Sequence, residues 1–121
     1  MEALHLEGTD ETPSVTLDPK KSIFEISGRS LPENAPDFYK PVLHWINDYA
    51  SNPNPVTEII FKLEYFNTAS AKLILDLLTA LEKINNAKVQ WYFNEDDEDM
   101  EEAGEDFSAL VKIPFDFKTY D

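Results

Sequence analysis

The sequence predicts an α/β fold with a mixed, mostly parallel sheet of about five strands and helices packed mainly on one face. Short segments alternate apolar with polar residues, as half-buried strands do, and the segments between them repeat apolar residues at helical spacing. Strands that alternate with helices along a chain pair in parallel through right-handed crossovers. The polar strand positions indicate that one sheet face is only partly covered.

We expect residues 1–121 to form a single domain. The chain is 42% hydrophobic, enough for a core, and no linker or internal repeat divides it. It has no cysteine, which excludes disulfides, a thiolate nucleophile and the usual Cys-rich zinc site. The sequence shows no apolar run long enough for a membrane span and no signal-peptide pattern, so we expect a soluble, cytoplasmic protein.

The N-terminal part is expected to contain an irregular arm followed by a hairpin. Residues 1–13 are largely polar and predict the arm. Segments 15–17 and 23–26 alternate on either side of the turn sequence 18–21, which predicts a hairpin that stops at Gly28.

A helix is predicted next. Residues 30–34 offer capping side chains and Pro36 suits a first turn. Pro41 implies a kink or a later start, and residues 52–55 end the helix. Its apolar residues recur at helical spacing: Phe38, Val42, Trp45, Ile46 and Tyr49.

The C-terminal part predicts strand, helix, strand, helix and strand. The first strand places Ile59, Phe61, Leu63 and Tyr65 on one face. The helix from Thr68 to Ile84 should bury Leu73, Leu77 and Leu81 against the sheet. Its apolar stripe comprises Leu73, Ile74, Leu77, Leu78, Leu81 and Ile84. A strand at 89–93, an acidic helix, and a last strand through Ile113, Phe115 and Phe117 follow.

The junction between residues 63 and 72 is the strongest functional signal. Asn67 and Thr68 both suit an N-cap, because their side-chain oxygens can accept from unpaired N–H groups of a first helical turn. Small residues follow, so a hydroxyl here is within reach of another protein. A phosphate here would lie at the positive end of the helix dipole. An ordinary cap is the simpler interpretation.

The net charge of −14 argues against nucleic acid and anionic membranes as partners. Nine of the 24 acidic residues lie in segment 95–106, which contains no base. The spacing does not match an EF-hand loop, and acids favour a helix N-terminus. We therefore favour a solvated helix face over a docking site for a basic partner, and both over a metal site.

No catalytic arrangement is evident. The three glycines are dispersed, so no glycine-rich loop can bind a nucleotide phosphate, and the two histidines lie far apart in the sequence. Neighbouring carboxylates in a solvated run do not separate their pKa values as acid–base catalysis requires. We expect a protein that is not an enzyme and has neither cofactor nor metal.

The junction resembles the phosphorylatable junction of STAS domains, the fold of anti-sigma-factor antagonists. Those proteins carry Asp-Ser-Ser-Gly there, and the first Ser is the kinase target. Aligning the junctions places Asn67 on the Asp, Thr68 on the phosphoacceptor, Ala69 on the second Ser and Ser70 on the Gly. The resemblance implies a STAS-like domain.

Five segments spread over almost the whole chain carry a second resemblance: Gly8–Pro13, Phe24–Pro32, Phe61–Ser70, Trp91–Met100 and Ala103–Phe107. In this order they resemble the SiaC family of regulatory phosphoproteins.

The SiaC resemblance implies a partner switch. A cognate serine/threonine kinase would phosphorylate Thr68 and a cognate PP2C-like phosphatase would remove the phosphate. The unphosphorylated protein would bind and activate a diguanylate cyclase, raise cyclic-di-GMP and promote aggregation and biofilm formation. The expected partner-binding residues are Asn67, Thr68, Ala69, Ser70 and Lys72.

Three alternatives remain open from the sequence. One is a constitutive scaffold in which Thr68 only caps a helix. A second is an anti-sigma-antagonist-like switch that acts on another target. The third is a carboxylate- or metal-dependent enzyme using segment 95–106.

Overall fold

The computed structural model describes all 121 residues of the chain. Six strands are present: β1 (Leu4–Leu6), β2 (Ser14–Asp18), β3 (Ile23–Ser30), β4 (Thr57–Phe66), β5 (Ala87–Asn94) and β6 (Phe115–Tyr120). The three helices are α1 (Ala35–Tyr49), α2 (Thr68–Leu81) and α3 (Glu98–Leu110).

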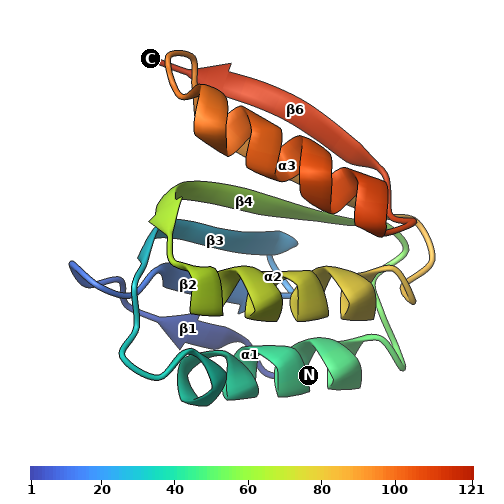
Figure 1. Cartoon of the computed structure of the whole chain (residues 1–121). Helices are drawn as coiled ribbons and strands as arrows, with labels where there is room; N and C mark the ends of the chain where they lie inside the picture. The colour runs from blue at the N-terminus through green and yellow to red at the C-terminus, as the bar shows by residue number, and fades with distance from the viewer.

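All six strands form one sheet in the order β1-β2-β3-β4-β5-β6. Strands β1 to β3 are antiparallel, and β3 to β6 are parallel. One helix joins each parallel pair, and Figure 1 shows all three helices in front of the sheet. Because spatial order follows chain order, right-handed crossovers place every helix on the same face. The predicted α/β fold with helices on one face is confirmed.

The strand that the sequence did not predict is β1, within the expected arm. Leu4 pairs with Leu17 and Leu6 with Val15, which makes β1 the sheet edge. The Trp45 indole also donates to the Glu2 carbonyl at 2.8 Å. Three residues with polar neighbours give too short a pattern to recognise, and only pairing with β2 makes them a strand.

Strand β3 continues to Ser30, two residues beyond its predicted end at Gly28. Gly28 has φ of +109°, a conformation that glycine adopts without steric cost. The chain therefore bends at this glycine without leaving the sheet, and Ser30 reaches the same sheet edge as the end of β4.

A bulge follows Gly28 and changes which residues of β4 face the helices. Gly28 lies opposite Leu63 but Arg29 lies opposite Tyr65, so one residue of β4 is skipped. The alternation of inward and outward side chains reverses there. Tyr65, predicted on the buried face, is 52% exposed, and this prediction was wrong.

Helix α1 is capped by Asn34, whose side chain accepts from the Asp37 N–H at 3.2 Å. The helix starts at Ala35 and runs through Pro41 to Tyr49, so the later start that Pro41 suggested is wrong. Pro41 is exposed, and water can therefore solvate the carbonyl that lacks its intrahelical donor.

The core lies between the sheet and the helices. Helix α2 contributes Ile74, Leu77, Leu78 and Leu81, all at most 2% exposed. Leu73, predicted in this stripe, is only half-buried, and the helix ends at Leu81 instead of Ile84. Of the predicted stripe residues only Leu73 is not buried, so the stripe faces the core as predicted.

Helix α3 packs closely on β5. The Trp91 ring is fully buried and its indole N–H donates to the Met100 carbonyl at 3.0 Å. A Cβ on Gly104 would lie 2.5 Å from the Trp91 ring, so this glycine permits the close approach. The last strand, β6, lies slightly later than predicted and pairs with β5. None of the helices has the length and apolar character needed to cross a membrane.

Candidate functional site

The candidate site lies where β4 ends and α2 begins, at the carboxyl edge of the parallel strands. Asn67 is the N-cap: its backbone is extended and its side-chain oxygen accepts from the Ser70 N–H at 2.8 Å. Sequence made Asn67 and Thr68 equally suitable caps. In the structure Asn67 is the N-cap and Thr68 is the first helical residue.

Thr68 and Ala69 are exposed at the start of α2. Their N–H groups come before the first intrahelical donor, whereas the Ser70 and Ala71 N–H groups both bond to Asn67. The first turn contains no acidic residue. The positive end of the helix dipole is therefore not neutralised beside an accessible hydroxyl, which is a favourable environment for a phosphate.

Ser70 occupies a different position from its neighbours. Its side chain is 0% exposed, and its Oγ donates to the Ser30 carbonyl at 3.2 Å and accepts from the Ser30 Oγ at 2.8 Å. Of the five expected partner-binding residues, the structure brings Thr68, Ala69 and Lys72 to the surface with half-buried Asn67, and places Ser70 beneath them.

Two residues that support this turn were not predicted. Ser30 is fully buried, and its Oγ lies 2.6 Å from the hydroxyl of buried Tyr39. Burial raises the pKa of Tyr39. One signal could have found Ser30: it continues the inward alternation of Phe24 and Ile26, and a polar residue at such a position requires a buried partner.

A hollow of ≈ 350 Å³ opens next to the junction, between the end of β4 and the start of α3. Four of its lining residues are hydrophobic and three carry carboxylates: Glu64, Tyr65, Phe66, Asp97, Asp99, Met100 and Ala103. Burial, followed by the charges of Glu64 and Asp97, raises the pKa of nearby Tyr120. The surface on this side of Thr68 is thus negative.

Lys72 supplies a positive charge on α2 itself. It is exposed and lies one turn after Thr68 on α2. Lys88 forms an ion pair with Asp116, and His44 lies 3.3 Å from Asp48. Lys72 has no such carboxylate partner. It is available to a phosphate or to a partner.

The acidic segment forms the start of α3. Asp97 is the N-cap and accepts from the Met100 N–H at 3.0 Å, and Glu98, Asp99 and Glu101 lie in the first turn. Negative charges at this end stabilise the helix through its dipole. No group of three or more His, Asp or Glu side chains in the chain is arranged to hold a metal ion.

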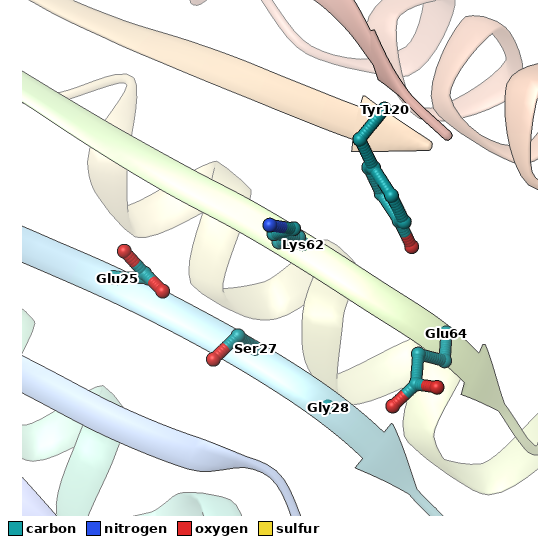
Figure 2. A pocket seen from close by; sticks show the side chains of 6 residues that line it. All are labelled: Glu25, Ser27, Gly28, Lys62, Glu64 and Tyr120. Carbon is teal, nitrogen blue, oxygen red and sulfur yellow. The ribbon is translucent and has the colours of Figure 1, made fainter. Parts of the chain in front are cut away.

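A second hollow lies on the sheet face that no helix covers. Figure 2 shows Lys62 of β4 between residues of β3 and Tyr120 of β6. The Lys62 ammonium is 4.7 Å from the centre of the Tyr120 ring and 5.9 Å from that of Tyr92. Carboxylates from Glu25 and Glu64 flank it, so the hollow has no net positive charge with which to hold an anion.

Comparison with known families identifies the family of this chain. The profile described as "SiaC family regulatory phosphoprotein" matches residues 6–120. The chain belongs to the SiaC family. A relative, an uncharacterised protein of Pseudomonas aeruginosa (strain UCBPP-PA14), is 27% identical over 125 residues, which cover 100% of this chain and 99% of that protein.

Solved structures give the same family. Apo-SiaC from Pseudomonas aeruginosa matches with a TM-score of 0.87 and 26% identity, over 98% of this chain and 99% of that one. A crystal structure of the diguanylate cyclase SiaD in complex with its activator SiaC, from the same species, matches with a TM-score of 0.89 and 26% identity. That match covers 97% of this chain and 99% of the other. The family assignment made from sequence is confirmed.

Proposed function

We propose that this protein is a phosphorylation-controlled activator of a diguanylate cyclase. Unphosphorylated, it binds the cyclase and raises the formation of cyclic-di-GMP, which promotes aggregation and biofilm formation. The observation that carries the proposal is the match, over nearly the full length of both chains, to a SiaC described as the activator in a complex with a diguanylate cyclase.

Thr68 is the proposed phosphoacceptor. It is exposed, begins a helix whose first turn lacks acids, and follows a cap that does not use its hydroxyl. The neighbouring hydroxyl of Ser70 is fully buried and hydrogen-bonded in both directions, so a kinase cannot reach it in the folded protein. This difference in accessibility supports Thr68 over Ser70.

The switch follows from the charge of the phosphate. Phosphorylation adds about −1.5 to −2 charges and three acceptor oxygens at one surface point. The free N–H groups of Thr68 and Ala69, together with the unpaired Lys72, can hold that group without unfolding α2. A cyclase surface that fits a neutral hydroxyl must then desolvate a charge, and the complex weakens.

The proposal includes two further partners and excludes others. A cognate serine/threonine kinase adds the phosphate and a PP2C-like phosphatase removes it. The protein itself acts by binding and catalyses nothing, and its charge of −14 disfavours nucleic acid. We place it in the cytoplasm, because a chain without cysteines forms no disulfides and does not depend on an oxidising compartment.

Titration of the cyclase tests the proposal. Purified unmodified and phosphorylated protein are added separately to the purified cyclase, and cyclic-di-GMP formation is measured. The unmodified form should activate and the phosphorylated form should not. Intact-mass measurement and fragment mapping of protein from its native cells should place a single phosphate on Thr68.

Three results would contradict the proposal. Equal activation by both forms would remove the switch and leave a constitutive scaffold. Binding to another target without any effect on the cyclase would favour an anti-sigma-antagonist-like role. A phosphate on Ser70 would overturn the assignment of Thr68.

A further inference from the structure

Three buried hydroxyl groups connect the start of α2 to helix α1. Tyr39 of α1, Ser30 at the end of β3 and Ser70 of α2 are each 0% exposed. The Ser30 Oγ lies 2.6 Å from the Tyr39 hydroxyl and 2.8 Å from the Ser70 Oγ. The contact joins three elements of the fold at the turn that carries Thr68.

The number of protons fixes the direction of these bonds. Each hydroxyl has one proton to donate. Ser70 donates to the Ser30 carbonyl and Ser30 Oγ donates to Ser70, so the Tyr39 hydroxyl must be the donor to Ser30 Oγ. The Ser30 carbonyl also accepts from the Asn67 N–H at 3.0 Å. The cap residue and the first turn are therefore bonded to the same strand end.

We propose that Tyr39, Ser30 and Ser70 are positioning residues that hold the first turn of α2 in the orientation in which partner proteins recognise Thr68. The inference rests on the proposed function, which makes Thr68 the phosphoacceptor and a cyclase contact. First turns of helices open easily because their N–H groups lack intrahelical partners. Thr68 lies between Asn67 and Ser70, and both are tied to Ser30.

The protein contains a matched control at the other end of α1. The Tyr49 hydroxyl lies 2.8 Å from the Thr57 Oγ1, and both residues are buried. Thr57 starts β4, at the opposite end of that strand from Thr68. Tyr49→Phe also removes the hydroxyl that accepts from the Asn54 N–H at 3.0 Å, so it should destabilise the fold at least as much as Tyr39→Phe.

Hydrogen exchange on the full-length protein tests the ordering of the turn without any partner. The reporters are the Ser70 and Ala71 amides, which bond to Asn67, and the Thr57 amide, which bonds to the Asn86 carbonyl at 3.0 Å. Tyr39→Phe should speed exchange of the Ser70 and Ala71 amides about fivefold, the size expected for one lost hydrogen bond, and leave exchange at Thr57 unchanged. Tyr49→Phe should speed exchange at Thr57 and leave exchange at Ser70 and Ala71 unchanged.

Titration of the cyclase tests the functional consequence. Tyr39→Phe should raise the concentration for half-maximal activation about two- to tenfold. The maximal activity should not change, because binding to the cyclase selects the ordered turn once enough of the variant is added. Tyr49→Phe should leave both values unchanged. Ser70→Ala should act like Tyr39→Phe, and the double variant should show less than the product of the two shifts, since both act through Ser30.

The two Phe variants decide the question between them. Equal exchange profiles, or equal half-maximal concentrations, in Tyr39→Phe and Tyr49→Phe overturn the positioning role. If Tyr39→Phe does not fold, Ser70→Ala against Tyr49→Phe gives the same comparison. Wild-type protein that does not activate the cyclase removes the proposed function, whereas an active wild type with an unaffected Tyr39→Phe removes only the positioning role.

Discussion

Helices α2 and α3 begin in the same way but differ in the charge of their first turns. Each follows a parallel strand at the same sheet edge, and each is capped by a side chain that accepts from an N–H of the first turn. Asn67 accepts from the Ser70 N–H at 2.8 Å, and Asp97 accepts from the Met100 N–H at 3.0 Å. The first turn of α3 carries three acids, whereas that of α2 carries none.

This difference determines which helix start can accept a phosphate. The acids of α3 already neutralise the positive end of its dipole, and they would repel a further anion. The start of α2 is neutral, lined by small residues and followed by Lys72. Two equivalent positions in one fold therefore differ in their electrostatics because of a few first-turn side chains, and the proposed function uses only the start of α2.

The largest expected effect comes from the buried stripe that anchors α2. Leu77 is 0% exposed, so Leu77→Ala should lower the free energy of unfolding by about 2–5 kcal/mol in urea denaturation. Thr79→Ala on the exposed face of α2 is the control and should change it by less than about 0.5 kcal/mol. Similar losses in the two variants would contradict the helix orientation.

A charge at the start of α2 should weaken cyclase activation. Thr68→Asp should raise the concentration for half-maximal activation about tenfold, equivalent to about 1.4 kcal/mol. The same change should stabilise the fold by about 0.3–1 kcal/mol, because an acid favours a helix N-terminus. Cyclic-di-GMP formation and urea denaturation measure the two effects.

Two variants control the interpretation of Thr68→Asp. Thr79→Asp adds the same charge to the same helix at an exposed position about three turns further on and should not alter activation. Thr68→Ala removes the hydroxyl without adding charge and should retain more activation than Thr68→Asp. If Thr68→Ala and Thr68→Asp lose equal activation, the hydroxyl governs binding and the charge does not.

The caps of the two helices should contribute equally to the stability of the protein but unequally to cyclase activation. Asn67→Ala and Asp97→Ala should each lower the free energy of unfolding by about 0.5–2 kcal/mol. Thr68→Ala should change it by less than about 0.5 kcal/mol, because Thr68 is not the cap. Only Asn67→Ala should also weaken cyclase activation, and an equal effect of Asp97→Ala would extend the contact surface to α3.

Exchanging the first-turn charges should produce the smallest effects. Ala69→Glu should stabilise the protein by about 0.3–1 kcal/mol, and Glu98→Gln should destabilise it by a similar amount. Both changes should diminish in high salt, which screens exposed charges. Thermal unfolding at low and high salt measures them, and a salt-independent change would indicate packing instead of the dipole.

The location of the junction was predictable because helix caps depend on local chemistry. Asn and Thr after an apolar strand and before an apolar stripe indicate a helix start wherever they occur. The choice between Asn67 and Thr68 as cap was not predictable, since both side chains can accept the same hydrogen bond. The cap residue is set by the residue at which β4 ends, and the pairing of β4 with β3 determines that end.

The burial of the residues around the junction could not be predicted from spacing. Tyr65 continues the apolar alternation of β4, but the bulge opposite Gly28 turns it outward. Ser70 looks like an exposed first-turn serine, but it lies over the end of β3 and bonds to Ser30. Both outcomes depend on the register between two strands that are distant in the sequence.

The sequence by itself determined the order of strands and helices, the single covered face of the sheet and the uncharged helix start at Thr68. These features depend on periodicity, capping and crossover handedness, which act over one or two neighbouring elements. Only the tertiary structure decided that residues 4–6 form an edge strand, that Tyr65 is exposed, and that Tyr39, Ser30 and Ser70 meet beneath the turn. Hydrogen bonds between distant segments determine these features, and no local pattern encodes which distant partner a buried hydroxyl or a short strand will find.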